Sequence, residues 1–283
     1  MRKNYLKFLS VMGAAALGIA LAAPAGAQDL LAKARAGETI RIGFANEVPW
    51  AYPGEGNKPL GFVNALALGV LKEMGITKIE PVVTEWGGLI PGLQANRFDI
   101  ITGGMYILNS RCQNVNFSEP VGVFGDAFIV AKGNPKSIQT YQDIKNKNAV
   151  VVTGAGFNIV EVAKKEGIAE NNIMQVPGPT EILAAVKAGR ADAGGVTFFT
   201  AQNLAKQSGG AVDVTDPSKL PEWTLNWVGI AFRKSDTAFL DAFNQAQKKY
   251  LGSSEMLASV AEYGYTKAQL PGKVTTEYAC ANR

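Results

Sequence analysis

An aromatic side chain and a guanidinium stand five residues apart in the segment GGMYILNSR, at Tyr106 and Arg111. The segment is rich in glycine and contains no acidic residue, and the aliphatic Leu108 lies between the two side chains. An arginine can hold a carboxylate through two parallel hydrogen bonds, and an aromatic ring attracts a cation over its face. The pair therefore predicts a site for a small zwitterion, with the carboxylate on Arg111 and the cation on Tyr106.

The side chains that most often catalyse reactions or hold metals are scarce in this sequence. It contains no histidine and two cysteines. Histidine is the most frequent general base and a frequent metal ligand, and the carboxylates lack the spacing of a calcium loop. The composition therefore favours binding over catalysis, and we expect no metal and no cofactor.

The first 27 residues have the pattern of a secretory signal peptide. A basic start, MRKNYLKF, precedes an alanine-rich apolar run, and small residues at 25–27 form a cleavage signal. We expect cleavage after Ala27 and a periplasmic protein rather than a permanent membrane anchor. The segment carries three basic residues and no acid, so its removal lowers the formal net charge from +4 to +1. Nothing in that charge predicts a nucleic-acid partner.

Cys112 and Cys280 both follow the export signal. Exported chains reach an oxidising compartment, although sequence alone does not prove pairing and two free thiols are the alternative. We expect a disulfide, because an exported chain with two cysteines rarely leaves both free. It would tie the C-terminal tail to the residue next to Arg111.

Strand-like and helix-like segments alternate along the rest of the chain. Extended runs are expected at 39–45, 126–132, 211–215 and 227–234, and helices at 62–74, from about 158, near 199–207 and within 236–263. This alternation predicts an α/β fold whose parallel sheets are covered by helices on both faces.

Two of these extended runs, 126–132 and 227–234, flank a βαβα unit. We therefore expect two lobes joined by two crossing strands. Lobe 1 would contain residues 28–130 and 224–283, and lobe 2 residues 131–223. Ligands of such sheets bind beyond the carboxyl ends of the strands, so the site is expected in the cleft between the lobes.

Several motifs in order along the chain resemble one known family. They are GF (61–62), EWGGLIPGLQANRFDIITGGM (85–105), SR (110–111), NFSEP (116–120) and ADAGGV (191–196). Together they resemble the polar amino-acid-type solute-binding proteins of ABC importers over roughly residues 39 to 265. The resemblance implies a type II-like periplasmic binding protein with a two-strand hinge. It also implies a monomer whose partner is a permease with its ATPase.

This chain departs from the family members that bind ordinary α-amino acids. Those members usually have a small hydroxyl residue at the position of Tyr106 and a threonine at the position of Leu108. They also place an aspartate after the D-A pair to hold the α-ammonium, whereas the pair at 192–193 here leads to Thr197 and Phe198. The departures imply a ligand with a carboxylate and without an ordinary α-amino group.

Within the family, the pattern is most similar to the ectoine and hydroxyectoine binders. Those proteins use a glutamate, three aromatic rings and the carboxylate-binding arginine. The matching positions are Glu47, Trp50, Trp86, Tyr106 and Arg111. A packing role is an equal alternative for Trp86. Glu47 can accept an N–H from the ring amidinium of ectoine, whereas glycine betaine offers no N–H and would leave the buried carboxylate without a partner.

The second lobe supplies further candidates. The segment 154–158 opens a helix whose backbone N–H groups can bind a carboxylate, which brings Phe157 and Asn158 to the ligand. Asn158 either caps this helix or contacts the ligand, and capping is the simpler interpretation. The predicted ligand-binding set is completed by Gly104, Thr197 and Phe198.

Other ligands and another class of protein stay open at this stage. Glycine betaine, a cyclic amino acid such as proline, or an ordinary polar amino acid would fit a binding protein. An enzyme on the same scaffold, similar to cyclohexadienyl dehydratase, would need a general acid or base, for which Glu47 is the obvious candidate. A sensory partner of a membrane receptor is a third class. The sequence favours a periplasmic protein that delivers ectoine or hydroxyectoine to an importer by lobe closure.

Overall fold

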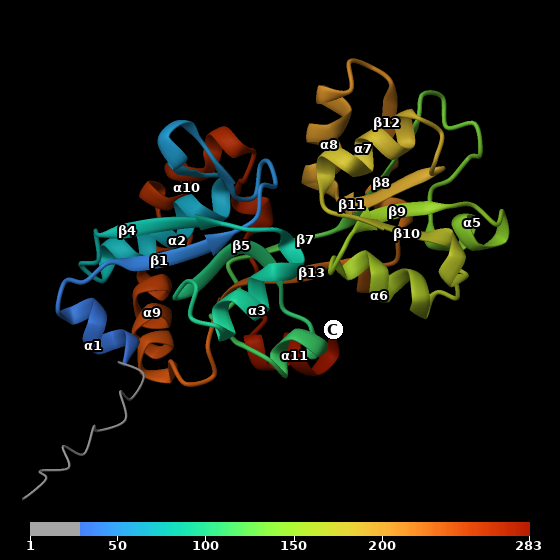
Figure 1. The fold of residues 1–283 in the computed structure, drawn as a ribbon. Helices are drawn as coiled ribbons and strands as arrows, with labels where there is room; N and C mark the ends of the chain where they lie inside the picture. Colours follow the sequence, from blue (N-terminus) through green and yellow to red (C-terminus); the bar gives the residue numbers. More distant parts are fainter. Residues whose placement is uncertain (1–28) are drawn as a thin grey trace, which may run out of the picture.

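The computed structural model describes residues 29–283, and the predicted signal peptide at 1–27 lies outside this range. The chain forms two lobes side by side, each built on a sheet with helices packed against it (Figure 1). Within residues 29–283, no helix combines the length and the apolar character needed to cross a bilayer.

The strands of the first lobe form one main sheet. They are β1 (Ile40–Phe44), β4 (Ile79–Val83), β5 (Ile100–Tyr106), β6 (Asn116–Phe117), β7 (Gly122–Phe124) and β13 (Asn226–Phe232). The order is β4-β1-β5-β13-β6, with β7 also paired to β13. β1 is parallel to β4 and β5, whereas β13 is antiparallel to β5, β6 and β7. A separate two-stranded ribbon consists of β2 (Tyr52–Pro53) and β3 (Pro59–Leu60).

The second lobe has a five-stranded sheet. Its strands are β8 (Asp126–Ala131), β9 (Val151–Gly154), β10 (Ile173–Val176), β11 (Ala193–Thr197) and β12 (Val212–Val214). The order is β10-β9-β11-β8-β12. β9 is parallel to β10 and β11, and β8 is antiparallel to β11 and β12.

The predicted α/β fold with two lobes is confirmed, but the sheets are mixed rather than mostly parallel. A parallel pair requires a crossover connection, usually through a helix of the same lobe. β8 and β13 instead arrive from the opposite lobe, and each enters its sheet against the direction of its neighbours.

Helices cover the sheets of both lobes. The α-helices are α1 (Leu30–Arg35), α2 (Phe62–Glu73), α3 (Leu89–Gln94), α4 (Asn109–Cys112), α5 (Tyr141–Asn146), α6 (Asn158–Lys165), α7 (Pro179–Lys187), α8 (Phe198–Gln207), α9 (Thr237–Tyr250), α10 (Ser254–Val260) and α11 (Thr276–Asn282). Short 3₁₀ turns are η1 (Glu55–Asn57), η2 (Trp86–Gly88), η3 (Glu170–Asn172), η4 (Pro217–Lys219), η5 (Glu222–Thr224), η6 (Ala261–Tyr263) and η7 (Lys267–Gln269).

Helix α2 shows how the apolar spacing builds the core of the first lobe. Phe62, Leu66 and Val70 recur every four residues and are fully buried, so they form one face of the helix. That face packs in the core of the first lobe, where α2 contacts β5, α9 and α10. Burial of each such side chain contributes about 1.5–3 kcal/mol.

Two segments connect the lobes. The chain leaves β7, passes Gly125 and enters β8, and it returns from β12 through η4 and η5 to β13. The expected boundary after residue 130 falls inside β8, in which residues 126–130 all pair with β11. We therefore propose that lobe 2 starts at Asp126, and the rest of the expected division stays a prediction.

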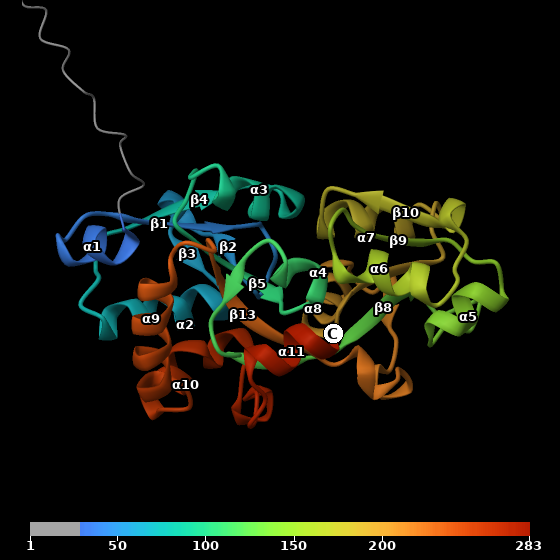
Figure 2. The same ribbon diagram turned by 90° about the horizontal axis from the view of Figure 1, so that it is seen from below.

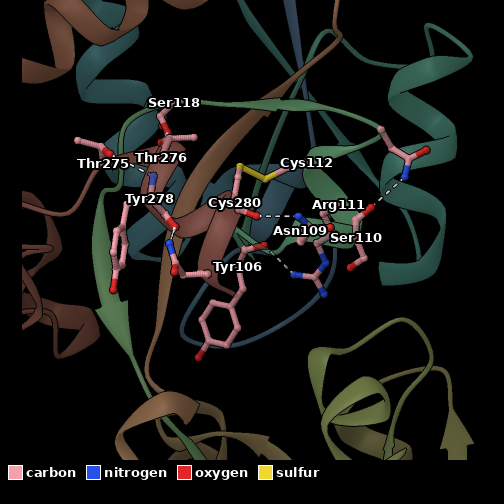
Figure 3. Close-up of a disulfide and its surroundings, with 12 residues drawn as sticks. Tyr106, Asn109, Ser110, Arg111, Cys112, Ser118, Thr275, Thr276, Tyr278 and Cys280 are labelled. Carbon is pink, nitrogen blue, oxygen red and sulfur yellow. Dashed lines mark hydrogen bonds between the residues drawn. A yellow bond between two sulfur atoms is a disulfide. The ribbon is translucent and has the colours of Figure 1, made fainter. Parts of the chain in front are cut away.

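The C-terminal helix is fastened beside the helical turn that follows β5. Helix α11 packs against α4, near the junction of the two lobes (Figure 2). Cys112 and Cys280 form the expected disulfide between them (Figure 3). Asn109 adds two hydrogen bonds, from Nδ2 to the carbonyl of Cys280 at 2.9 Å and from its backbone N–H to Arg283 at 2.8 Å. The turn that carries Arg111 is thus held from outside the site.

Candidate functional site

A small cavity between the lobes gathers nine of the ten predicted ligand-binding residues. The first lobe contributes Glu47, Trp50, Trp86, Gly104, Tyr106 and Arg111, and the second lobe contributes Phe157, Asn158 and Thr197. The space between their side chains is about 20 Å³, which is close to the volume needed for one water molecule. In this arrangement of the lobes, the cavity therefore has no room for a larger ligand.

Arg111 places a buried cation on this cavity. It belongs to α4, directly after β5, and is 8% exposed. Nη1 donates to the carbonyl of Tyr106 at 3.1 Å, and Nη2 donates across the lobes to the carbonyl of Gly156 at 3.0 Å. Burial lowers the pKa of Arg111 to about 10, against the opposing effect of the charge on Glu161.

No ion pair within the described chain involves Arg111. Its two hydrogen bonds to carbonyl groups use two of the five N–H donors of a guanidinium. A buried cation without a carboxylate partner is destabilising. An anion bound in the cavity would supply the missing partner.

Glu47 places a buried carboxylate on the same cavity. Its exposed fraction is 5%, and Oε1 accepts a hydrogen bond from Thr200 Oγ1 at 2.7 Å. Burial raises the pKa of Glu47 to about 7, and the bond from Thr200 partly offsets this rise. None of the ion pairs among residues 29–283 includes Glu47. The site therefore holds one cation and one carboxyl group that is anionic above about pH 7, and neither forms an ion pair with the described residues.

A chain of hydrogen bonds crosses between the lobes and returns at this site. Trp50 Nε1 donates to Thr197 Oγ1 at 3.0 Å, and Thr197 Oγ1 donates to Thr200 Oγ1 at 2.9 Å. Thr200 in turn donates to Glu47. Thr197 also caps α8 by accepting the backbone N–H of Thr200. Consecutive hydrogen bonds of this kind strengthen one another by polarisation. Thr197 and Thr200 of the second lobe therefore hold Trp50 and Glu47 of the first lobe in place.

Trp50 is both a wall of the cavity and a member of the core. It is 1% exposed, and its ring lies 4.6 Å from Phe124 and 4.8 Å from Phe62 between centroids. Gly104 makes room for it, because a Cβ at this position would stand 2.4 Å from Trp50 Cε3. Gly104 also has a φ of +82°, a conformation that side chains disfavour.

Trp86 and Tyr106 provide the other two rings. Trp86 Nε1 donates across the lobes to the carbonyl of Gly156 at 3.1 Å, and its ring meets Phe157 edge to face. Tyr106 lies edge-on to Trp50, with ring centroids 6.1 Å apart. Its hydroxyl is buried and has no hydrogen-bond partner among the described residues. An unsatisfied buried hydroxyl costs about 1–3 kcal/mol, so the site offers a further polar atom to a ligand.

Two second-lobe predictions need correction. Asn158 does not cap α6, because Phe157 occupies the cap position and Asn158 is the first helical residue. Its Nδ2 donates instead to both carboxylate oxygens of Asp126, at 3.1 and 3.0 Å. Phe198 does not line the cavity. Phe198 and its neighbour Phe199 face a separate depression of about 610 Å³, whereas the preceding residue, Thr197, lines the cavity.

The sequence reasoning missed Thr200 and Asp126. Thr200 follows the cap residue Thr197 by three positions, the spacing of one helical turn, which is the signal that would have indicated it. Asp126 starts an apolar strand, and its burial depends on Tyr141 and Asn158, which are distant in sequence. Within the described range, no group of three or more His, Cys, Asp or Glu side chains is arranged to hold a metal ion.

Comparison with known proteins gives the family. The model for bacterial extracellular solute-binding proteins, family 3, matches residues 40–265. A probable amino-acid ABC transporter periplasmic-binding protein of Sinorhizobium fredii is 34% identical over 278 residues, which are 95% of this chain and 92% of that one.

Two solved structures are similar throughout. EhuB in complex with hydroxyectoine has a TM-score of 0.80 and 28% identity, over 90% of this chain and 98% of that chain. An ancestral amino acid-binding protein, a precursor of cyclohexadienyl dehydratase, has a TM-score of 0.71 and 28% identity, over 83% and 99% of the two chains. The chain belongs to family 3 of the bacterial extracellular solute-binding proteins, which confirms the family resemblance found in the sequence.

Proposed function

We propose that this member of the solute-binding family is a periplasmic protein that captures ectoine or hydroxyectoine for an ABC importer. The observation that carries the proposal is the pair of unpartnered buried charges, Arg111 and Glu47, on one cavity between the lobes. A zwitterion neutralises both at once, and a net-neutral ligand is cheaper to bury than an ion. We further propose export with cleavage after Ala27 and a monomeric protein that presents its closed form to the permease.

The cation side of the site favours a cation that carries an N–H, such as a ring amidinium, over a quaternary ammonium. Glu47 Oε1 is taken by Thr200, and Oε2 takes part in no hydrogen bond that the described residues form, so one carboxylate oxygen is left to accept an N–H. Trp50, Trp86 and Tyr106 surround the same space. A cation over an aromatic face gains about 0.5–2 kcal/mol per ring. The complex of EhuB with hydroxyectoine, at 28% identity, supports the same ligand class.

We propose that the lobes close on the bound ligand. Four hydrogen bonds between described residues join the lobes around the cavity, and they involve Trp50, Trp86, Arg111 and Glu47. A fifth joins Ser110 Oγ to Glu161 Oε1 at 3.1 Å. A ligand that bridges Arg111 and Glu47 of the first lobe and contacts the second lobe would favour closed lobes over open ones, with a cavity wider than the roughly 20 Å³ of the ligand-free structure.

Titration calorimetry of the mature chain tests the proposal. Carried-over ligand is removed by unfolding and refolding, and the protein is titrated with ectoine, hydroxyectoine, glycine betaine, proline and arginine. We expect ectoine or hydroxyectoine to bind with a Kd of about 1 µM or tighter, and betaine at least about tenfold more weakly, because betaine leaves Glu47 without an N–H. Glu47→Gln serves as the matched variant, and the difference in affinity between ectoine and betaine should be smaller in it.

Two results would replace the proposal. Heat from arginine or proline alone would show that the ligand is an ordinary amino acid, as the name of the Sinorhizobium relative suggests for that protein. Turnover of prephenate or arogenate would show an enzyme, in which Glu47, with its pKa raised to about 7, would be the general acid or base.

A further inference from the structure

Asp126 is a buried carboxylate that has no role in the ligand binding proposed above. It is the first residue of β8, directly after the residue that links the lobes, and it is fully buried. Oδ2 accepts from the hydroxyl of Tyr141 at 3.1 Å, and both oxygens accept from Asn158 Nδ2. No ion pair of the described chain includes Asp126.

This arrangement costs stability. A buried carboxylate with neutral donors alone is less stable than an apolar side chain of the same size. Burial raises the pKa of Asp126 to about 7, although the hydrogen bonds from Asn158 and Tyr141 hold it lower than burial alone would. A destabilising group in contact with Asn158, a residue of the cavity wall, indicates a role that an apolar residue would not serve.

The contact with Asn158 determines which end of the amide faces the cavity. In the structure the NH₂ group of Asn158 points at Asp126 and donates to both of its oxygens. Above its pKa, Asp126 is an ionised carboxylate that accepts hydrogen bonds and has no proton to donate, which fixes this orientation. The amide oxygen then lies on the other branch of the side chain, and Asn158 is a wall of the cavity. No hydrogen bond from residues 29–283 reaches this oxygen, since the side-chain bonds of Asn158 are the two to Asp126.

We propose that Asp126 is a positioning residue that holds the Asn158 amide with its oxygen toward the ligand. The site would then accept one ligand N–H at Glu47 from the first lobe and a second at Asn158 from the second lobe. The inference rests on the proposed function and narrows the ligand class to zwitterions whose cation carries two N–H donors, such as a cyclic amidinium. A quaternary ammonium offers neither.

A set of isosteric variants tests this role by calorimetry with ectoine. Asp126→Asn can present either an oxygen or an NH₂ group to Asn158, so the orientation is no longer fixed and affinity should fall by about tenfold, the worth of one hydrogen bond. Tyr141→Phe is the matched control, because it removes the other hydrogen bond to Asp126 and keeps the one to Asn158. It should bind within about twofold of the wild type.

The exchanged pair Asp126→Asn with Asn158→Asp provides the rescue. There the amide at 126 donates to the carboxylate at 158, whose other oxygen accepts the ligand N–H, so affinity should return to within about threefold of the wild type. A folded Asp126→Asn that binds like the wild type would overturn the proposal. An exchanged pair that binds no better than Asp126→Asn would overturn it as well.

A readout without ligand separates this proposal from the proposed function. The Asn158 side-chain amide signals, identified by their loss in Asn158→Asp, are followed by NMR as the pH rises through about 7, where burial places the titration of Asp126. Other titratable groups around Asn158 are Tyr141, Tyr106, Glu47 and Arg111, together with Glu161 and Lys165 of the same helix. Glu47→Gln removes the one whose pKa burial also raises to about 7. A shift that disappears in Asp126→Asn supports the proposal, and an amide insensitive to pH in the wild type overturns it. If the wild type ignores ectoine, the proposed function fails and the NMR result still decides the role of Asp126.

Discussion

Replacing Arg111 with methionine should weaken ligand binding strongly while leaving the fold about as stable as before. Methionine fills a similar volume without charge or hydrogen-bond donors. In the structure Arg111 is 8% exposed, has no acidic partner in the described chain, and bonds to the carbonyls of Tyr106 and Gly156. The variant therefore removes the group that we expect to bind the ligand carboxylate and few other interactions.

The expected magnitudes follow from these contacts. Truncating one partner of a buried, hydrogen-bonded charge pair costs 2–5 kcal/mol, which corresponds to a loss in affinity of about 30-fold to 4,000-fold. In the ligand-free protein, two carbonyls lose a donor, at about 1 kcal/mol each. Removal of a buried, unpaired cation offsets this, because its desolvation penalty is several kcal/mol. The free energy of unfolding should thus stay within about 1 kcal/mol of the wild-type value.

Calorimetry with ectoine and urea denaturation of ligand-free protein measure the two quantities on the same preparations. Arg111→Lys is the matched control. It keeps the charge but lacks the planar fork, so its affinity should fall between those of wild type and Arg111→Met. Binding by Arg111→Met within about threefold of the wild type, or a loss of more than about 3 kcal/mol in unfolding free energy, would refute the reasoning.

Three further predictions concern pH, the disulfide and the unpaired hydroxyl. Because burial raises the pKa of Glu47 from 4.5 to about 7, its contribution to ligand-free stability is fully present below about pH 4.5 and is lost as the pH rises through about 7; denaturation curves at several pH values should show this fall, and Glu47→Gln should show a smaller one, because Asp126, whose pKa burial also raises to about 7, still contributes. Cys112→Ser combined with Cys280→Ser opens a link across 168 residues and should lower the free energy of unfolding by about 2–5 kcal/mol in urea, whereas equal stability would contradict a structural disulfide. Tyr106→Phe removes a buried hydroxyl without a partner and should raise the unfolding free energy by about 1 kcal/mol, so a lower melting temperature would show that the hydroxyl is satisfied in solution.

The fold was predictable where local pattern determines it. The apolar spacing of 62–74 and the run 126–132 became α2 and β8 with ends displaced by a single residue. The strand directions were not predictable from the sequence. The alternation of strands and helices does not indicate that β8 and β13 enter their sheets from the opposite lobe. A pattern within one segment carries no information about where its neighbours in the sheet come from.

The site was predictable in its residue types and less so in its contacts. Arg111 and Glu47 face one cavity, as the motifs suggested. Trp50 was expected as a loop residue, but the structure also buries it against Phe62 and Phe124, and the latter is 74 positions away in the sequence. Such packing is set by tertiary structure. The same holds for Asp126, whose partners Tyr141 and Asn158 come from two helices, and no local pattern distinguishes it from an exposed acid at the start of a strand.

The central claim is that a single ligand pairs the two buried charges, and a crystal structure of the refolded mature protein with ectoine tests it most directly. The account predicts the ligand carboxylate within hydrogen-bond distance of Arg111, about 2.7–2.9 Å, and a ring N–H on the free carboxylate oxygen of Glu47. Trp50, Trp86 and Tyr106 should surround the amidinium. A ligand whose carboxylate lies away from Arg111, or one bound outside the cavity between the lobes, would contradict it.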